Sequence, residues 1–514
     1  MDEGARLESV YPAKKRDRGF ESHPLRNFSL IFTFLFLIFL LLNKNKNIIF
    51  MAEKFDVLVI GGGPGGYVCA IRASQLGFKT ALVEKDRVGG ICLNWGCIPT
   101  KALLKSAEVF NLIKRADEFG LRVENPNFDF KKIIQRSRQV ADRLSKGVEF
   151  LLRKNNVVKF SGYGFLLKRN LVGVKSDKEE FEVEAKHIII ATGARPREIP
   201  GIAIDGVKVI TSKEAMLLEE PPKSMVIIGA GAIGVEFAYF YNSFGTKITL
   251  VEMMPSILPN EDREITEILE KSFKKSGIDI LTNTRVIEAK KNGDFAEVKI
   301  QNQNGEMVLK ADVALVAVGV QGNSDKLGLE ELGVEVEKSF IKVDKTSYQT
   351  SVEGIYAIGD VIGPPLLAHV ASAEGIRCIE KIAGVETKPI DYNNIPSCTY
   401  CIPQVASIGL TEQRALELGY EIKVGRFPFR ANGKALSLGE TEGLVKVIFD
   451  AKYGEILGAH IIGPEATELI AEFGVAKTLE STAFEIVKTV HAHPTLSEAL
   501  MEASADALKE AIHI

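Results

Sequence analysis

The sequence predicts an α/β protein that contains two copies of one strand, turn, helix and strand unit. The first copy starts with the apolar segment 55–60, passes through a glycine-rich turn into the helical segment 67–76, and ends its second strand at Glu84. The turn reads G-x-G-x-x-G, with its glycines at Gly61, Gly63 and Gly66. In this pattern the first glycine permits a tight turn, the second lets a pyrophosphate approach the backbone, and the third lets helix and strand pack closely. The segment therefore indicates a Rossmann-like dinucleotide-binding fold.

The same unit recurs later in the chain. The apolar strand 225–228 leads into a second G-x-G-x-x-G turn, a helix from Val235 and a strand that ends in Glu252. The glycines of this turn are Gly229, Gly231 and Gly234. In both copies the acid follows the first glycine by 23 positions, 84 − 61 and 252 − 229. One such turn can arise by chance, but two in register with strand, helix and acid predict two nucleotide sites.

The acids that end these units bear on cofactor choice. Glu84 and Glu252 stand where a carboxylate accepts hydrogen bonds from ribose hydroxyls. A carboxylate at Glu252 would accept from a free 2′-hydroxyl and would repel a 2′-phosphate. The second site is therefore predicted to prefer NAD to NADP.

Length and composition limit the function classes. The 514 residues correspond to three or four domains at about 150 residues per domain. The net charge of −3 provides no field that would attract a polyanion, so nucleic-acid binding is not predicted. Six cysteines in this length do not form a secreted disulfide framework, and no metal site is predicted.

Two of the cysteines stand between the two units. They occur in the segment Gly89-Gly-Ile-Cys92-Leu-Asn-Trp-Gly-Cys97-Ile-Pro-Thr-Lys101. Five residues of straight helix would separate their Cα atoms by about 7.5 Å, beyond the disulfide limit of about 6.8 Å, so the pair requires a distorted backbone. Gly96 and Pro99 fit an irregular helix start, where the pKa of a thiol is lowered. Two unrelated buried cysteines are the alternative, and the context favours a reactive pair.

This segment closely resembles the redox-disulfide motif of the flavoprotein disulfide reductases, especially those that act on dihydrolipoamide. The resemblance extends from about Lys54 to the carboxyl end. It implies that the first nucleotide fold binds FAD, that the second binds NAD, and that a carboxyl-terminal α+β domain forms a homodimer. By the same resemblance, Cys92 exchanges with substrate and Cys97 faces the flavin.

The resemblance also implies an order of domains. The expected segments are a doubtful extension (1–50), an FAD-binding domain with the redox disulfide (51–200), an NAD-binding domain (201–322), a return to the FAD-binding or central domain (323–394) and a dimerisation domain (395–514).

Further cofactor residues are assigned by resemblance alone. Lys101 matches a lysine beside the flavin N5, Glu236 matches the acid that pairs with it, and Asp360 matches the aspartate that binds the ribitol of FAD. The other FAD positions implied are Lys85, Gly90, Gly164, Thr192, Gly193 and Ala368. The other NAD positions implied are Val286 and Gly319.

A histidine motif stands near the carboxyl end, in His491-Ala-His493-Pro-Thr-Leu-Ser-Glu498. A glutamate five residues after a histidine, across a proline and a helix start, can orient the imidazole and raise its basicity. An isolated histidine is more often structural, but the resemblance implies that His493 is the catalytic base and Glu498 its partner. In the family this pair comes from the other subunit. His491 is predicted to be structural.

Two segments depart from the simple pattern. Residues 318–324 stand where relatives commonly carry Gly-Arg-x-Pro-Asn, which leaves the polar contacts of that loop open. Cys398 and Cys401 form a C-x-x-C without the second ligand pair that zinc needs, and both are predicted to be incidental.

The first fifty residues differ from the rest. Their apolar run 28–42 has fifteen residues, shorter than the lower limit of about 17 for a membrane span and within the range of about 7–15 for a signal peptide. No cleavage pattern follows, and Met51 directly precedes the first strand. We interpret Met51 as the true start and the extension as an artefact. A membrane anchor and a cleaved signal are the alternatives.

The resemblance implies that protein-bound dihydrolipoamide is oxidised to lipoamide while NAD⁺ is reduced, in the cytoplasm or, in a eukaryote, the mitochondrial matrix. The implied partners are the lipoyl domains and core of 2-oxo acid dehydrogenase complexes or the glycine-cleavage lipoyl protein. One alternative is a related NAD(P)H-dependent disulfide reductase. Glu252 argues against those reductases that use NADPH, because its carboxylate would repel the 2′-phosphate. Another is a membrane-attached NADH:quinone flavoprotein, which would leave Cys92, Cys97 and His493 without a role.

Overall fold

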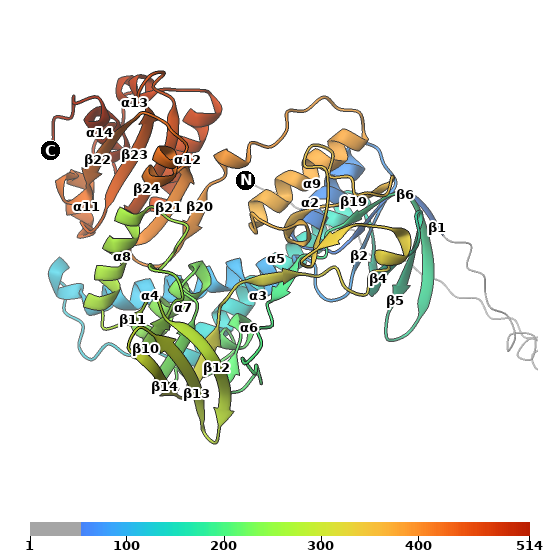
Figure 1. Cartoon of the computed structure of the whole chain (residues 1–514), viewed down its shortest axis with the longest axis horizontal. Coiled ribbons are helices and arrows are strands. Elements are labelled where there is room, and N and C mark those ends of the chain that lie inside the picture. The colour runs from blue at the N-terminus through green and yellow to red at the C-terminus, as the bar shows by residue number, and fades with distance from the viewer. Residues whose placement is uncertain (1–52) are drawn as a thin grey trace, which may run out of the picture. The chain divides into compact units, whose positions relative to one another are not determined.

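The computed structural model describes residues 53–514 (Figure 1). The predictions about the extension 1–50 and its apolar run 28–42 lie outside the described residues. Within 53–514, no helix combines the length and the apolar character needed to cross a membrane.

The first nucleotide fold is a parallel sheet that draws strands from distant parts of the chain. Its parallel strands, in spatial order, are β3 (Val158–Ser161), β2 (Thr80–Glu84), β1 (Glu53–Ile60), β6 (Glu180–Ile190) and β19 (Ile355–Ala357). The antiparallel strands β4 (Tyr163–Lys168) and β5 (Leu171–Lys175) extend it. The three consecutive residues Val57, Leu58 and Val59 are fully buried, as expected for a parallel strand covered on both faces.

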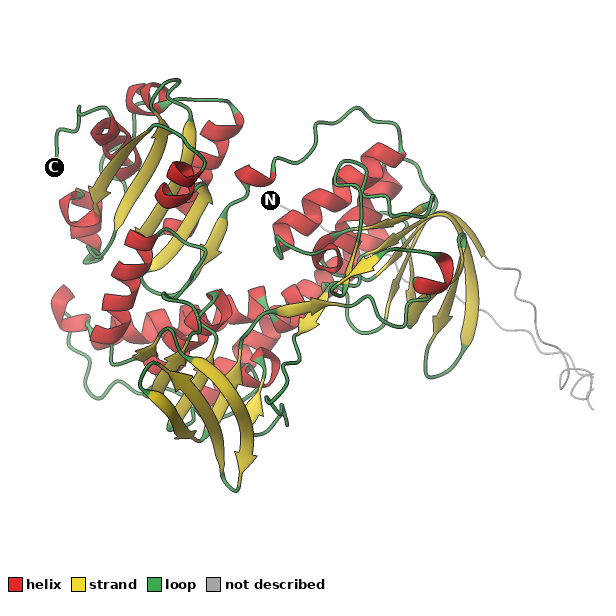
Figure 2. Ribbon diagram, in the orientation of Figure 1, coloured by secondary structure: helices red, strands yellow, loops and turns green. Residues whose placement is uncertain are grey.

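Helices complete this fold. Helix α2 (Pro64–Gln75) follows the first glycine turn and packs along α9 (Ala368–Ile382), and α5 (Phe130–Lys154) also contacts α2. Figure 2 shows these helices beside the strands of the sheet. Because α9 directly follows the β19 region, the sheet and this helix pair bring residues near 360 next to the first glycine turn.

The second nucleotide fold repeats the parallel arrangement. Its strands, in spatial order, are β11 (Asp279–Leu281), β10 (Lys247–Val251), β9 (Ser224–Ile228), β15 (Val313–Val316) and β8 (Val209–Ile210). Its helices are α6 (Ser212–Ala215), α7 (Ala232–Ser243) and α8 (Arg263–Lys275). An antiparallel three-stranded sheet shares an apolar core with one face of the parallel sheet; its strands are β12 (Arg285–Asn292), β13 (Phe295–Asn302) and β14 (Gly305–Ala311).

The chain enters and leaves the second fold through two paired strands, β7 (Ala194–Pro196) and β16 (Val320–Gly322). The segment 318–324, which departs from the family pattern, contains β16. Asn323 Nδ2 donates to the Thr192 carbonyl at 2.9 Å, and Thr192 Oγ1 donates to the Asn323 carbonyl at 2.8 Å. Arg195 Nη1 donates to Asn323 Oδ1 at 3.0 Å. These contacts hold together the two places where the chain passes between the nucleotide folds. We keep 201 and 322 as proposed limits of the second domain.

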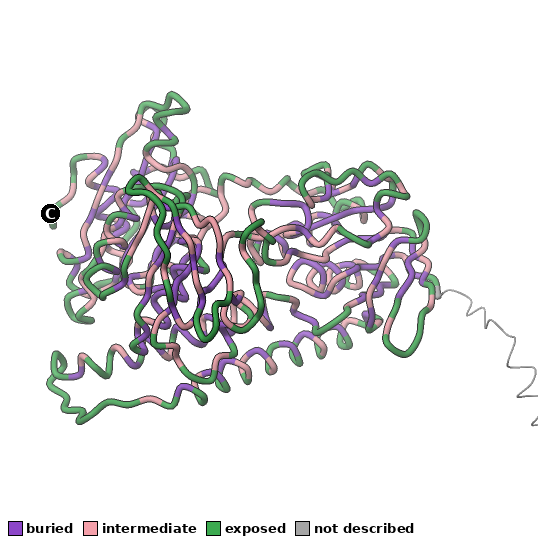
Figure 3. Tube along the Cα trace, turned by 60° about the horizontal axis from the view of Figure 1, so that its bottom comes forward, coloured by how far each residue is buried: buried purple, intermediate pink, exposed green. Residues whose placement is uncertain are grey.

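The last domain is an antiparallel sheet covered by helices. Its strands, in spatial order, are β20 (Ser397–Thr399), β21 (Gln404–Gly409), β24 (Ile456–Gly463), β23 (Leu444–Asp450) and β22 (Ile422–Pro428). Its helices are α10 (Glu412–Glu417), α11 (Gly433–Leu438), α12 (Ala466–Thr478), α13 (Ala483–Lys488) and α14 (Glu498–Ala507). Residues of α12 and α14 share one apolar core with the sheet. Figure 3 shows buried segments in this domain and in both nucleotide folds.

The cysteines of the C-x-x-C segment enter different cores. Cys398 packs against the core of the last sheet, whereas Cys401 is fully buried in the core that includes α7 of the second fold. Burial raises the pKa of Cys398 to about 11, so its thiol stays protonated at neutral pH.

Candidate active site

The predicted cysteine pair lies at a junction of two helices. Cys92 belongs to α3 (Gly90–Trp95), and Cys97 is the first residue of α4 (Cys97–Lys114). Gly96 separates the helices with the non-helical angles φ −150° and ψ −115°. Because the helix is broken at this residue, straight-helix spacing does not hold the cysteines apart, and their side chains form a hydrogen bond with one another.

The two thiols differ in charge. The hydrogen bond from Cys92 lowers the pKa of Cys97 to about 7, and the positive charge of Lys101 acts in the same direction. The pKa of Cys92 is raised, first because it donates that hydrogen bond and second because it is buried. In the reduced pair, therefore, the proton resides on Cys92 and the negative charge on Cys97.

An ion pair continues from the cysteines toward the second fold. Lys101 Nζ donates to both carboxylate oxygens of Glu236 at 2.9 Å, and Glu236 is only 4% exposed. Tyr400, which follows β20, donates its backbone N–H to Glu236 Oε1 at 3.0 Å. The ring of Tyr400 also lies 4.4 Å from Lys101 Nζ. Tyr400 therefore joins the predicted Lys101–Glu236 pair. No local sequence pattern predicted this contact, because Tyr400 is 164 positions from Glu236.

The third glycine of each turn meets a steric requirement. A Cβ atom on Gly66 would lie 1.8 Å from the Gly61 carbonyl oxygen, and one on Gly234 would lie 1.9 Å from that of Gly229. No side chain fits at these distances, so both turns need glycine there. Each turn leads into a helix amino terminus, α2 or α7, where free N–H groups can receive a pyrophosphate.

The acids at the strand ends hold the glycine turns in place. Glu84 Oε2 accepts from Gly62 N at 2.7 Å, and Glu252 Oε2 accepts from Ala230 N at 2.7 Å. In each pair the acid stands 22 positions after the donor, so the contact is equivalent in the two folds. Each carboxylate retains further acceptor capacity, which a ribose hydroxyl could use.

Asp360 carries a carboxylate without a hydrogen bond in the described part of the chain. It lies in the short turn Gly359–Ile362 just after β19. Burial, followed by the nearby charge of Glu374, raises its pKa to about 6. A half-buried acceptor without a partner costs free energy that a ligand hydroxyl would recover, so this residue fits a polyhydroxyl chain such as the ribityl group of FAD.

The other predicted FAD positions lie near the carboxyl ends of the first sheet. A Cβ on Gly90 would lie 2.8 Å from Gly63 Cα, which places Gly90 against the glycine turn. A Cβ on Gly164 would lie 3.1 Å from side-chain atoms at the ends of β1 and β2. The remaining positions follow strands or begin a helix: Lys85 after β2, Thr192 and Gly193 after β6, and Ala368 as the first residue of α9.

The predicted NAD positions are arranged similarly around the second sheet. Gly229, Glu252 and Gly319 follow the carboxyl ends of β9, β10 and β15. Val286 instead lies in β12, the first strand of the antiparallel sheet. Ligands of open parallel sheets bind at the carboxyl ends of the strands, where most of these residues lie.

The histidine pair is formed but lies in another part of the molecule. His493 Nδ1 is 2.9 Å from Glu498 Oε1, and Glu498 Oε2 accepts from Thr495 N at 2.8 Å. Burial raises the pKa of Glu498, but the Thr495 N–H and His493 outweigh it and hold this pKa below its usual value. The His493 side chain is 79% exposed. Figure 1 shows α14, which Glu498 begins, on the last domain, whereas α3 lies between the nucleotide folds.

The neighbouring histidine has a different environment. The side chain of His491 is 5% exposed, and its Nε2 atom lies 2.8 Å from Glu472 Oε1. Its Nδ1–H donates to the Thr489 carbonyl at 3.0 Å. Both ring nitrogens are thus occupied by contacts within the domain, which suits a structural role.

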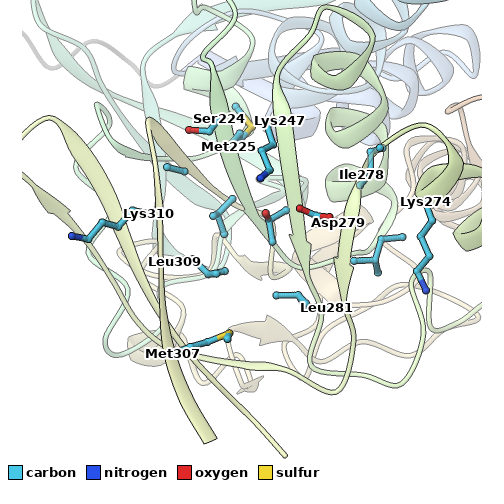
Figure 4. A pocket seen from close by; sticks show the side chains of 15 residues that line it. Ser224, Met225, Lys247, Lys274, Ile278, Asp279, Leu281, Met307, Leu309 and Lys310 are labelled. Atoms are coloured by element: carbon cyan, nitrogen blue, oxygen red, sulfur yellow. The ribbon is translucent and has the colours of Figure 1, made fainter. Parts of the chain in front are cut away.

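A groove of about 680 Å³ lies away from all these residues (Figure 4). Leu309 of β14 and Leu281 of β11 lie on opposite sides of it, and Lys247 and Asp279 mark the amino-terminal ends of β10 and β11. None of the predicted site residues lines it. The groove is therefore at the opposite ends of the strands from Gly229 and Glu252.

Comparison with known proteins identifies the family. Residues 55–375 match the family described as pyridine nucleotide-disulphide oxidoreductase, and residues 395–504 match its dimerisation domain. A dihydrolipoyl dehydrogenase of Rhizobium etli is 51% identical over 475 residues, which cover 89% of this chain and 98% of the relative. One from Bacillus subtilis is 44% identical over 474 residues, which cover 90% of this chain and all of the relative.

Solved structures agree with this relationship. The crystal structure of LpdA from Mycobacterium tuberculosis has a TM-score of 0.82 and 26% identity, covering 88% of this chain and 99% of that one. The flavoprotein disulfide reductase RclA from Escherichia coli has a TM-score of 0.78 and 27% identity over the same shares. The α/β fold with a carboxyl-terminal dimerisation domain, predicted from the glycine turns and the resemblance, is confirmed. This chain belongs to the pyridine nucleotide-disulphide oxidoreductase family.

Proposed function

We propose that the protein is an enzyme that oxidises dihydrolipoyl groups to lipoyl groups and reduces NAD⁺, with FAD as its bound cofactor. The relatives named dihydrolipoyl dehydrogenase at 44–51% identity support this activity over the alternatives. The observation that carries the proposal is the hydrogen-bonded Cys92–Cys97 pair at the start of α4, next to the Lys101–Glu236 ion pair. A dithiol substrate and a dithiol–disulfide pair exchange two electrons without further reagents.

The chemistry at the cysteines follows from their charge difference. In the oxidised enzyme a thiolate of the substrate attacks Cys92 Sγ, the Cys92–Cys97 bond breaks, and Cys97 leaves as a thiolate. The second substrate sulfur then attacks the first, the ring of the lipoyl group closes, and Cys92 is released and takes the second thiol proton. The products are oxidised lipoyl, protonated Cys92 and Cys97 thiolate, the distribution that the two pKa shifts favour.

We assign the first proton to a histidine of a second subunit. The partner subunit's His493 accepts the proton of the attacking thiol, and Glu498 orients the imidazole through the 2.9 Å contact. In one chain the exposed His493 belongs to the last domain, which matches the dimerisation domain of the family. A homodimer therefore completes the proposed site.

Residues of both nucleotide folds fit their cofactors. FAD would be held at its pyrophosphate by the first glycine turn and at its ribityl chain by Asp360, and NAD at the second turn with Glu252 on the ribose. When bound, FAD would supply the acceptor for the two electrons that the reduced pair gives up as the Cys92–Cys97 disulfide forms again, and these electrons would reach NAD⁺ as hydride. Lys101, fixed by Glu236 and Tyr400, keeps a positive charge beside Cys97 and stabilises its thiolate.

The proposal also includes the proteins that carry the substrate lipoyl groups and the cellular compartment. The substrate lipoyl groups would be those of 2-oxo acid dehydrogenase complexes or of the glycine-cleavage lipoyl protein, in the cytoplasm or the mitochondrial matrix. The purified protein should reduce NAD⁺ with dihydrolipoamide and fail to do so with glutathione. Rapid NADH oxidation by a quinone with no dihydrolipoamide turnover would contradict the proposed activity.

Cofactor selectivity gives a separate prediction. Replacing Glu252 by arginine should raise the KM for NAD⁺ by about tenfold or more, equivalent to about 1.4 kcal/mol, because a ribose acceptor is lost, and should improve the use of NADP⁺. Steady-state assays with both nucleotides measure this. Glu252→Gln is the matched variant, since it can still accept from Ala230 N while losing the charge that repels a 2′-phosphate. Unchanged NAD⁺/NADP⁺ selectivity in both variants would refute the role of Glu252.

A further inference from the structure

Helix α9 carries a buried carboxylate that the proposed mechanism does not use. Glu374 is 2% exposed, and its two oxygens have different partners. Oε2 accepts from Gly359 N at 2.7 Å, and Oε1 accepts from the Tyr392 hydroxyl at 2.7 Å. Burying a carboxylate costs free energy even when both of its oxygens accept hydrogen bonds. The presence of Glu374 at this position therefore needs an explanation.

The contact with Gly359 places Glu374 against the turn that carries Asp360. Gly359 has φ +72° and begins the turn Gly359–Ile362, whose amino-terminal neighbour Ile358 is tied to β6 by a hydrogen bond to Ile190 O. The Glu374 contact holds the N–H of the next peptide, that of Gly359. Together they define the position from which the Asp360 carboxylate projects.

Glu374 also acts on Asp360 through its charge. Its negative charge raises the pKa of Asp360, after the larger effect of burial. The Asp360 charge in turn makes a small contribution to the raised pKa of Cys92.

Several groups surround Glu374 itself. Lys345 Nζ lies 4.0 Å from Oε1, and Tyr348 contacts the Tyr392 hydroxyl at 3.3 Å. The Cys378 thiol, on the same helix, is close enough for the Glu374 charge to raise its pKa. Burial raises the pKa of Glu374, while the hydrogen bonds from Tyr392 and Gly359 and the charge of Lys345 oppose that rise.

We propose that Glu374 is a positioning residue for FAD: its hydrogen bond with Gly359 N fixes the Gly359–Asp360 turn, from which the Asp360 carboxylate reaches the ribityl chain. This inference rests on the proposed function, in which Asp360 accepts a hydrogen bond from FAD.

The proposal also predicts how the affinity for FAD depends on pH, and the direction of this dependence follows from the linkage between proton uptake by Asp360 and release of FAD. FAD is bound by ionised Asp360, and in the free protein this carboxylate takes up a proton below about pH 6. Affinity for FAD should therefore fall by about tenfold per pH unit below that point, because one proton is taken up as FAD leaves. Removing the Glu374 charge makes Asp360 more acidic, so release should begin at a lower pH.

The test measures FAD retention by the purified full-length flavoprotein. Samples are equilibrated between pH 4.5 and 8, ultrafiltered, and the flavin in the filtrate is quantified by absorbance. Glu374→Gln should move the midpoint of release down by about one pH unit. Tyr392→Phe, which keeps the charge but removes a hydrogen bond, should speed release at pH 8 without lowering the midpoint.

Glu380→Gln is the matched control. Glu380 is a buried carboxylate on the same helix, but it binds Arg72 and Arg377 and makes no contact with the turn. Its loss should leave the midpoint of release unchanged. A general loss of stability would instead affect both variants alike.

The outcomes separate the two claims. An E374Q midpoint equal to or above that of the wild type, or a Y392F midpoint lowered as far as that of E374Q, would overturn the inference. If E374Q does not fold, a wild-type rate of FAD release in Y392F at pH 8 would overturn it. Wild-type protein that purifies without flavin and does not bind added FAD would instead reject the proposed function.

Discussion

Replacing Cys92 by alanine is expected to reduce NAD⁺-linked dihydrolipoamide oxidation by at least about 10³-fold. The substrate thiolate then has no disulfide to attack, because Cys97 alone cannot form the pair. Steady-state measurement of NADH formation tests this. The same variant should still oxidise NADH with an artificial electron acceptor, since that reaction needs the nucleotide folds and not the cysteines.

Cys398→Ser is the matched control for this experiment. Cys398 is half-buried in the last domain, away from Cys92 in the sequence and in a different apolar core. Its replacement should leave dihydrolipoamide oxidation near the wild-type rate. Dihydrolipoamide-dependent NADH formation by the Cys92 variant at the wild-type rate would show that the pair is not the redox centre.

Replacing His493 by glutamine is expected to lower kcat with dihydrolipoamide by about 10²–10⁴-fold, the usual contribution of a general base. The side chain is 79% exposed, so the substitution should not disturb folding. Activity should fall less in Glu498→Gln, because the amide oxygen can still accept from His493 Nδ1 at the observed 2.9 Å. Rates measured across the pH range test the assignment, since the fall in rate on the acidic side, where a base is protonated, should change in the His493 variant.

Mixed dimers test whether His493 acts across subunits. Each homodimer of Cys92→Ala or of His493→Gln should be inactive, while a dimer with one chain of each kind contains one intact site. Random reassembly of equal amounts should restore about a quarter of wild-type activity, since half of the dimers are mixed and each has one of two sites. If the mixture stayed as inactive as its components, Cys92 and His493 would have to come from the same chain.

Local sequence patterns were sufficient for the two nucleotide folds. The glycine positions are dictated by contacts over a few residues, such as the approach of Gly66 to the Gly61 carbonyl. The run of apolar residues in β1 reflects burial on both faces of a parallel strand. The spacing of the cysteines indicated a broken helix, and the non-helical Gly96 between α3 and α4 matches that expectation.

Other features depended on contacts between distant residues. Lys101 and Glu236 are 135 positions apart and meet only because α4 and α7 pack together, so resemblance and not spacing had to join them. No local sequence pattern indicated the roles of Tyr400 and Glu374. The partner of Tyr400 is Glu236 of the second nucleotide fold, and the partner of Glu374 is Gly359, in the turn that precedes its helix.

The sequence by itself determined the fold class and both glycine turns and indicated the cysteine pair as a candidate redox centre, because each depends on backbone conformation or burial within a short segment. Only the tertiary structure showed that Glu84 and Glu252 support the glycine turns, and that the proton of the reduced pair favours Cys92. It also showed that the His493 side chain is 79% exposed. These properties arise from hydrogen bonds, charges and burial between segments that only the folded chain brings together.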